Sequence, residues 1–368
     1  MKINTQRLLA LALLTGSAVA CSATSQDLGN SDPNAPAPAP TVTSPDPSSP
    51  APTPTTPAPT TGPVTPPAPS FTAGVPFTLV DPKFGGIQSM WGAGPSDIWA
   101  VGDANGIAHY DGTKWSFFQK PSTSILSDGY ALGAVWGTSP TSAWAVGTVS
   151  GAGIDKAQVL HWTGSDWVEP TAKLNNLGEY YILNGVWAAG DADVWTVGAT
   201  TEGKGFAAHL HDGAWEKLPL DPVGTYFSVW GSDPAHVWIG TGTSILAYDG
   251  AGFTPVSTGL TSKVLALAGT SASDVWAFGT SGLARHWDGA TWTTTPMGAP
   301  ILFMAAYARS ANDVYAVGQL PNEGSTVAHW NGTSWTRGSA KDGAGLRAVW
   351  GSANEVWAMG VGVVYHGK

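Results

Sequence analysis

The sequence predicts an all-β fold, a seven-bladed β-propeller of four-stranded antiparallel blades. One motif, seen first as "SDIWAVGDANGIAHYDGTKW" (96–115), occurs seven times. Its spacing of roughly 43 residues is the length of one propeller blade. Each copy reads as four short strands separated by turn residues. No stretch after residue 71 keeps a helical hydrophobic period over three turns.

The first unit sets the pattern of strands. Strand a is "IQSMW" (87–91), strand b is "IWAVG" (98–102), strand c is "IAHY" (107–110) and strand d is "KWSFF" (114–118). An Asp-Gly pair lies between strands c and d, and these residues tolerate the positive φ of a tight hairpin. The first recurrent aromatic position holds Trp91, Trp136, Trp187, Trp230, Ala268, Tyr307 and Trp350. A second aromatic follows eight residues later in six units and seven residues later in the last. Because these positions recur in every unit, we assign them to packing between blades.

The ends of the repeat predict how the ring closes. The seventh unit has no strand d after "VYHG" (364–367), and "VPFTLVDP" (75–82), before the first unit, resembles such a strand. We therefore expect an N-terminal strand to complete the last blade and to cover the open edge of its strand c. The propeller is assigned to residues 71–368.

Two segments precede the propeller. Residues 1–20 begin with Lys2 and Arg7 and continue into an apolar run that is too short to span a bilayer, which is typical of a signal peptide. Cys21 follows directly and is the only cysteine, so no intramolecular disulfide can form. Residues 21–70 consist mostly of Pro, Ala, Thr and Ser, and this composition predicts a disordered tether.

The segment "AVAC" (18–21) resembles the lipobox of bacterial lipoproteins. The resemblance implies cleavage before Cys21, a lipid attached to it, and a lipid-anchored protein of the cell envelope that faces the periplasm or the exterior. Ser22, rather than an acidic residue, follows the cysteine, and in enteric lipoproteins that pattern implies the outer membrane. An ordinary secretory signal with an incidental cysteine is the alternative.

The repeat "VWGS…DVWAVG…HWDG…W" resembles a large group of bacterial, notably myxobacterial-type, propeller lipoproteins. The resemblance covers residues 71–368 and implies a fold rather than an activity. The repeat is also loosely similar to the photosystem II stability factor and to sialidase-type propellers. However, "DGTKW" (111–115) lacks the residue that separates Asp from Gly in the sialidase Asp-box.

Composition and motifs limit the function classes. The formal net charge of −10 argues against a nucleic-acid partner, which would favour a basic patch. No phosphate loop, Ser-His-Asp order or metal-ligand spacing appears. We therefore assign no catalytic residue, no metal and no cofactor. Histidines beside the c–d turns and aspartates before strand b recur in most units, and we interpret them as turn and packing residues.

Candidate binding residues stand where the repeat varies. The residue three before the first aromatic differs from unit to unit and begins strand a, next to the variable d–a loops. In chain order it is Gln88, Gly133, Asn184, Phe227, Leu265, Met304 and Arg347. These side chains should ring the mouth of the central channel, apolar on one arc and polar on the other. Tyr130, Tyr180 and Tyr181 lie outside the repeat positions on long neighbouring loops and are further binding candidates.

We therefore expect a monomeric, membrane-tethered, extracytoplasmic binding or scaffold protein that is not catalytic. Its ligand would be a glycan, a peptide or a protein, bound through the variable face of the propeller. Arg347, the only charge in the ring, would orient a carboxylate or carbonyl group. A glycosidase- or lyase-type enzyme using the channel and an assembly factor are the alternatives, and a fold does not choose among them. The ring residues could also merely plug a narrow channel.

Overall fold

The structure is a computed structural model of the 368-residue chain. It describes residues 72–73, 86–103, 106–118, 130–151, 154–177, 181–221, 224–256, 263–280, 282–321, 324–340 and 345–367. The predicted signal peptide (1–20) and tether (21–70), with Cys21, lie outside these ranges. In the described ranges, no helix has the length and apolar character of a membrane span.

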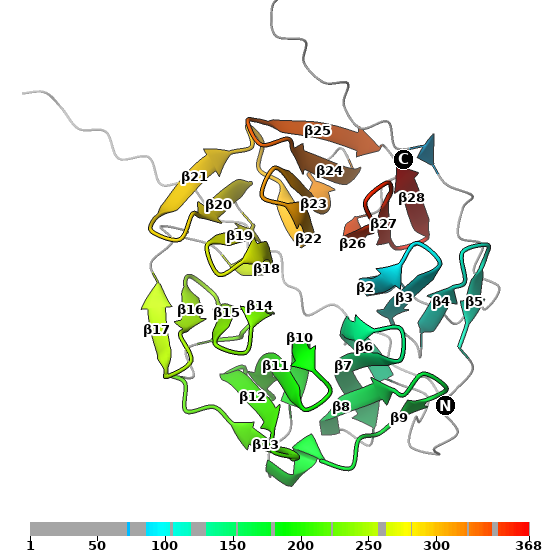
Figure 1. The fold of residues 1–368 in the computed structure, drawn as a ribbon, viewed down its shortest axis with the longest axis vertical. Coiled ribbons are helices and arrows are strands. Elements are labelled where there is room, and N and C mark those ends of the chain that lie inside the picture. The colour runs from blue at the N-terminus through cyan, green and yellow to red at the C-terminus, as the bar shows by residue number, and fades with distance from the viewer. Residues whose placement is uncertain are drawn as a thin grey trace, which may run out of the picture. The chain divides into compact units, whose positions relative to one another are not determined.

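The propeller has seven four-stranded antiparallel sheets arranged around a central axis, which confirms the predicted fold class (Figure 1). Strand a of each blade lies innermost and strand d lies at the rim. The a strands are β2 (Ile87–Gly94), β6 (Tyr130–Ser139), β10 (Tyr181–Gly190), β14 (Ser228–Asp233), β18 (Val264–Ser271), β22 (Leu302–Ser310) and β26 (Leu346–Gly351). The b strands are β3 (Asp97–Gly102), β7 (Ser142–Gly151), β11 (Asp193–Thr200), β15 (His236–Gly240), β19 (Asp274–Gly279), β23 (Asp313–Leu320) and β27 (Val356–Gly360).

The outer strands complete blades 1 to 7 in the same order. The c strands are β4 (Ile107–Tyr110), β8 (Ile154–Trp162), β12 (Gly205–His211), β16 (Ile245–Tyr248), β20 (Leu283–Trp287), β24 (Gly324–Trp330) and β28 (Val363–Gly367). The d strands are β5 (Trp115–Phe117), β9 (Trp167–Val168), β13 (Ala214–Lys217), β17 (Phe253–Val256), β21 (Trp292–Pro296), β25 (Trp335–Ala340) and, in the last blade, β1 (Thr72–Ala73). A 3₁₀ turn, η1 (Leu174–Leu177), follows β9.

An N-terminal strand closes the last blade, as the sequence predicted. Strand β1 pairs antiparallel with β28, with Thr72 opposite His366 and Ala73 opposite Tyr365. The closing strand that the structure describes consists of Thr72 and Ala73, whereas the segment 75–82, which the sequence predicted for this place, lies outside the described residues. The pairing gives β28 a neighbour on its outer edge, which would otherwise present unpaired N–H and C=O groups.

The spacing of the two recurrent aromatics follows from strand register. In the first blade Trp91 lies opposite Trp99, and one extra residue bulges between Gly92 and Gly94 before the a–b turn. Blade 7 has no such irregularity at this turn, and Trp350 lies opposite Trp357. Since a bulge inserts one residue into one strand of a pair, the spacing is eight residues in the first six blades and seven in the last.

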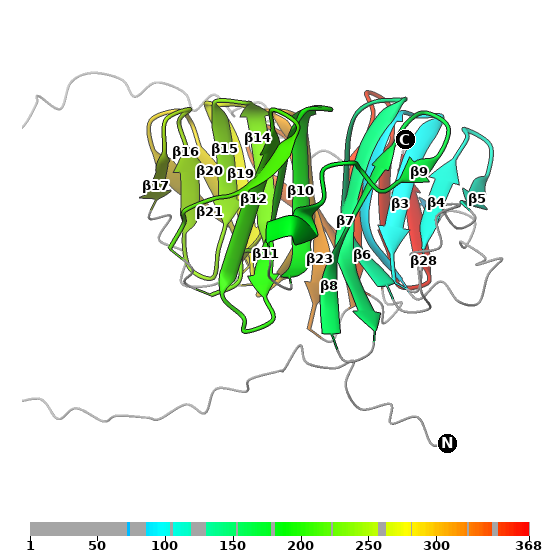
Figure 2. The same ribbon diagram turned by 90° about the horizontal axis from the view of Figure 1, so that it is seen from below.

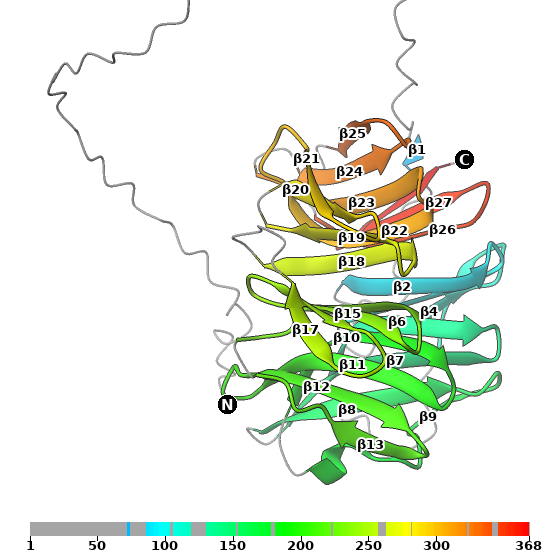
Figure 3. The same cartoon turned by 60° about the vertical axis from the view of Figure 1, so that its left-hand side comes forward.

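Most of the apolar core lies between blades. Trp99 is 1% exposed, stacks on His109 at 4.3 Å between ring centroids, and contacts Trp162 and Trp167 of the next blade. Neighbouring blades lie side by side around the ring (Figure 3). The recurrent aromatics of strand b thus fill the wedge between sheets, in agreement with the packing role predicted for them.

The recurrent acids and histidines pair with each other inside blades 1, 3, 5, 6 and 7. His109 Nε2 lies 2.7 Å from Asp97 Oδ1, and the other pairs are His209–Asp193, His286–Asp274, His329–Asp313 and His366–Glu355, at 2.7–2.9 Å. The carboxylate at the start of strand b therefore holds the imidazole that stacks on the aromatic of the same strand. The sequence predicted packing roles for these residues, but not this pairing.

Candidate functional site

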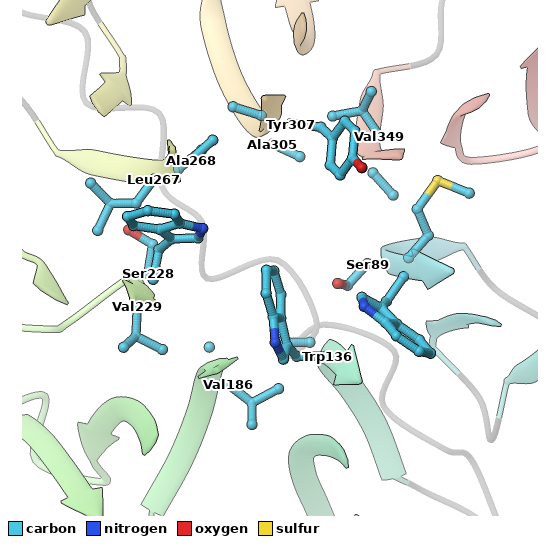
Figure 4. A pocket seen from close by; sticks show the side chains of 18 of the residues that line it. Ser89, Trp136, Val186, Ser228, Val229, Leu267, Ala268, Ala305, Tyr307 and Val349 are labelled. Carbon is cyan, nitrogen blue, oxygen red and sulfur yellow. The ribbon is translucent and has the colours of Figure 1, made fainter. Parts of the chain in front are cut away.

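The centre of the ring holds a cavity of about 440 Å³, which we call the central channel. All seven a strands contribute to its wall. Side chains of Ser89, Trp136, Ser228 and Tyr307 surround it (Figure 4). A cavity of this size falls in the range of small-ligand sites.

The seven variable residues predicted to ring the channel all lie in its wall. In six blades the a–b ladder skips this residue, so that it forms a β-bulge. The skipped residues are Gln88, Gly133, Asn184, Leu265, Met304 and Arg347. In blade 4 the equivalent Phe227 comes directly before β14, and its backbone N–H donates to Gly240 O at 2.8 Å. A bulge re-aims a side chain, and all seven residues are half-buried.

These residues mark the end of the channel at which the a strands begin, which we call the mouth. The d–a and b–c connections lie at the same face of the propeller. On this face the β7–β8 ladder continues as far as Gly151 opposite Ile154, and the hairpins β7–β8 and β11–β12 reach beyond those of blades 4 and 5 (Figure 2). The hairpin β23–β24 of blade 6 is also long, with Leu320 opposite Gly324, so longer hairpins border the mouth at blades 2, 3 and 6.

Two separate sets of hydrogen bonds hold the polar arc of the ring. Arg347 Nη1 donates to Gln88 Oε1 at 2.8 Å. The amide of Gln88 donates from Nε2 to both carboxylate oxygens of Asp103, at 3.0 and 3.1 Å. Asn184 Nδ2 donates to Tyr226 O at 2.9 Å. Because Asp103 accepts from Nε2, the amide must turn Oε1 toward Arg347, which orients the guanidinium.

Two residues at the mouth were missed by the sequence analysis. Asp103 directly follows the glycine that recurs at the end of strand b in every unit, and no other unit has an acid after it. That departure from the repeat was the available signal. Lys263 lies over the ring of Phe227, with Nζ 5.2 Å from the ring centroid. Lys263 directly precedes β18, strand a of the next blade, so its contact with Phe227 is evident only from the structure.

The other end of the channel is built from aromatic rings and glycines. A Cβ at Gly137 would lie 2.5 Å from the ring of Trp91, and a Cβ at Gly92 would lie 2.8 Å from that of Trp350. The first aromatic of one blade thus covers the residue after the first aromatic of the next blade. Trp91 keeps part of its surface open to the channel, whereas the strand-b aromatics are buried. Burial raises the pKa of the Tyr307 hydroxyl in this wall.

Of the three tyrosines predicted as further binding residues, the structure describes the side chain of Tyr181 only. Tyr181 is 0% exposed and stacks on Phe206 at 3.6 Å between ring centroids. It belongs to the core between blades, so the expectation of an exposed aromatic is wrong for this residue. Tyr130 begins β6, but its side chain is not among those described, and Tyr180 lies outside the described residues.

Charge is sparse in the channel wall. Of the residues that line the cavity in the described ranges, Arg347 alone is charged. Within those ranges no group of three or more His, Cys, Asp or Glu side chains gathers in a way that could hold a metal ion. The wall instead offers a few polar groups beside apolar surface, which suits recognition of a ligand by shape and hydrogen bonds.

Comparison with known proteins finds matches among solved structures. No family model and no curated protein sequence matches the chain. The chain is similar to YCF48 bound to D1 peptide, with a TM-score of 0.57 and 15% identity over 78% of this chain and 94% of that chain. A second match is YCF48 from Cyanidioschyzon merolae, also with a TM-score of 0.57 and 15% identity, covering 78% of this chain and 96% of that chain. The WD40 β-propeller domain of Doa1 has a TM-score of 0.57 and 13% identity, covering 77% of this chain and 93% of that chain. These likenesses show the fold.

The match to YCF48, a photosystem II assembly factor, agrees with the predicted distant resemblance to that type of propeller. The resemblance to myxobacterial-type lipoproteins stays a prediction.

Proposed function

We propose that this propeller is a non-catalytic binding module that holds an extended peptide segment of a protein partner at the channel mouth. The observation that carries the proposal is the ring of bulged residues. One backbone irregularity, repeated in six blades, places six of the seven variable residues in the wall of the same cavity, and Phe227 joins them from the residue before β14. The residue two positions before the first aromatic is small in every blade, so the variation is confined to the position that forms the ring.

The chemistry of the ring matches a peptide. Arg347, oriented by Gln88, offers its remaining N–H groups to a carboxylate or main-chain carbonyl, and such charge-assisted bonds are strong. On the other arc, Phe227, Leu265 and Met304 offer apolar surface to a side chain. An extended peptide presents both kinds of group within a few residues. A propeller of the same fold, YCF48, has been solved with a D1 peptide.

The half-buried state of the ring residues favours binding over a plug. Side chains that merely fill a narrow channel would bury one another, whereas these leave a cavity of about 440 Å³. The glycosidase- or lyase-type enzyme, the assembly factor and a glycan ligand in the channel stay as predictions from the sequence.

We also propose that the propeller is held at a membrane by lipid on Cys21, with residues 21–70 as a tether, in the cell envelope. The support is the sequence of residues 1–70, since the lone cysteine directly follows the apolar run. The lipid would confine binding to the neighbourhood of the membrane, and the outer membrane is the proposed location.

A peptide-display selection on the full chain tests the binding function. The selected peptide should lose affinity for Arg347→Ala by roughly ten- to a hundredfold, as expected for a lost charge-assisted hydrogen bond. Phe227→Ala should weaken binding as well, while Thr254→Ala, on the exposed outer strand β17, should not. If both ring variants bind like the wild type and only their stability falls, the ring is a plug.

A further inference from the structure

A second cavity, of about 630 Å³, lies between the outer strands of blades 3 and 4. Its walls come from β12 and β13, from the residues after β13, and from β16 and β17, which are neighbours in the ring (Figure 1). No residue lines both this cavity and the central channel. We call it the outer groove and define it by His211, Glu216, Leu218, Asp221, Tyr248 and Phe253.

The rings at this blade boundary are smaller than those between blades 1 and 2, and this leaves space for the groove. Between blades 1 and 2, the buried strand-b tryptophan contacts two tryptophans, Trp162 and Trp167, at 4.7 and 5.2 Å between centroids. Between blades 3 and 4, Trp195 instead meets Tyr248 at 5.2 Å and Phe253 at 6.1 Å. An indole replaced by a phenyl ring leaves space at the rim.

Leucine and glycine enlarge the space further. Leu218 donates its backbone N–H to Ala207 O, just as Phe118 donates to Ile107 O in blade 1, so the two residues are equivalent. Phe118 packs on Trp162 at 5.2 Å, whereas blade 3 has only the smaller Leu218 at this place. Gly252, next to Phe253, adds no side chain. Several departures from the repeat thus coincide at one boundary.

The polar wall comes from an exceptional c–d turn. In blade 1 the Asp111 carboxylate caps the turn by accepting from Thr113 N at 2.9 Å. In blade 3 the turn is Asp212–Gly213, with φ of 50° and 76°, and His211 pairs with Ala214 across it. Positive φ at both central residues is the geometry of a two-residue hairpin. The tighter turn places a histidine in the strand where other blades have a turn residue.

His211 and Glu216 form a polar pair on the groove wall. His211 Nε2 lies 2.9 Å from Glu216 Oε2, and the His211 ring lies 4.9 Å from that of His209. Both side chains of the pair are partly exposed. The imidazole holds the Glu216 carboxylate in place, so the pair presents a positioned hydrogen-bond acceptor on the groove wall. At the other end of the groove, Asp221 adds a further carboxylate.

We infer that the outer groove is a saccharide-binding site, separate from the peptide site at the channel mouth. A sugar ring has an apolar C–H face, which would lie on the aromatic rings of Tyr248 and Phe253. Its hydroxyl groups would donate to the carboxylate of Glu216, which His211 holds in place, and to that of Asp221. A concave site with apolar walls and a few convergent polar groups is the usual form of a small-ligand site.

The test is titration of the full chain with a panel of neutral mono- and oligosaccharides, followed by NMR or calorimetry. A panel member should bind the wild type. Phe253→Trp, which introduces the tryptophan found in the d strands of blades 1, 2, 3, 5 and 6, should fill the groove and weaken that binding about tenfold or more without lowering the melting temperature. Glu216→Gln should weaken binding about tenfold as well. Trp292→Phe, the reverse exchange on blade 5, and Arg347→Ala in the channel should both bind the saccharide like the wild type.

Three results would overturn the inference: no saccharide binding at millimolar concentrations, wild-type binding by both Phe253→Trp and Glu216→Gln, or occupation of the groove only by a cationic probe such as choline. Should Phe253→Trp fail to fold, Glu216→Gln alone decides, because its side chain is exposed. The outcome does not depend on the peptide site, whose own variant Arg347→Ala serves here as a control.

Discussion

Arg347 in the last blade donates to Gln88 in the first across 2.8 Å, although 259 positions separate them in sequence. The contact crosses the boundary at which the propeller closes. Gln88 is itself held by Asp103, so three side chains from two blades form one polar arc. The orientation of the only charged ring residue therefore depends on closure of the ring.

This arc predicts a positioning role for Asp103. Replacing Asp103 by Ala frees the Gln88 amide and lets the Arg347 guanidinium rotate. Affinity for a selected peptide should fall, though by less than in Arg347→Ala, with little change in melting temperature. Binding measured for both variants checks this. Asp288→Ala removes the same charge from a c–d turn on the opposite face and should not change affinity. Equal affinities for Asp103→Ala and the wild type would contradict the role.

The contact between Trp91 and Gly137 predicts a steric limit. A methyl group at Gly137 would lie 2.5 Å from the Trp91 ring, so Gly137→Ala should lower the free energy of unfolding by about 1–3 kcal/mol. Chemical denaturation measures the change. Gly94→Ala is the matched control, because a Cβ there meets nothing within 4 Å. Similar losses in the two variants would mean that the Trp91–Gly137 packing does not matter for stability.

The pairing of β1 with β28 predicts what truncation does. A chain that starts after Ala73 leaves the edge of β28 unpaired, and unpaired edges promote association. This chain should melt at a lower temperature and associate at high concentration, compared with one that starts at Thr65. Light scattering and thermal melts of the truncated and the longer chain test this prediction. A truncated chain that stays monomeric and melts like the longer one would show that β1 is dispensable.

The histidines predict a pH dependence of opposite sign at two sites. Burial lowers the pKa of His161, partly offset by the charge of Asp191. The contribution of neutral His161 to stability is thus complete at pH values above the ordinary histidine pKa of about 6.5, and it is lost as pH falls toward the folded-state pKa. The hydrogen bond to Glu216 raises the pKa of His211. That contribution is present below the ordinary value and is lost as pH rises through the folded-state pKa. NMR titration should give a lower midpoint for His161 than for His211, and the reverse order would refute the assignment.

The proposed lipid anchor predicts the behaviour of Cys21→Ala. This variant should leave the membrane fraction and should not incorporate labelled palmitate, because the chain has no other cysteine. Ser22→Ala serves as the control and should stay in the membrane fraction. A Cys21→Ala protein that remains in membranes and labels like the wild type would end the lipoprotein proposal.

Much of the candidate site could be predicted because the repeat itself marks it. Comparing seven copies showed one position in strand a that varies beside one that stays small, and the structure places all seven variable residues in the channel wall. The bulge that directs six of them there was not evident, because a bulge is a mismatch between two strands and leaves no mark on the sequence of one strand alone. Tyr181 was misjudged for a related reason. It lies outside the repeat positions, yet Phe206 of its own blade covers it.

The sequence by itself determined the number of blades, their four strands and the turns between them. These features depend on interactions within about 43 residues, such as hairpin chemistry at Asp-Gly pairs and the alternation of apolar residues. Only the tertiary structure decided that Thr72–Ala73 closes the ring, that Gln88 links Asp103 to Arg347, and that smaller rings at Tyr248 and Phe253 open the outer groove. Each of these depends on which distant residues meet and on the space left between them, and both are properties of the assembled ring.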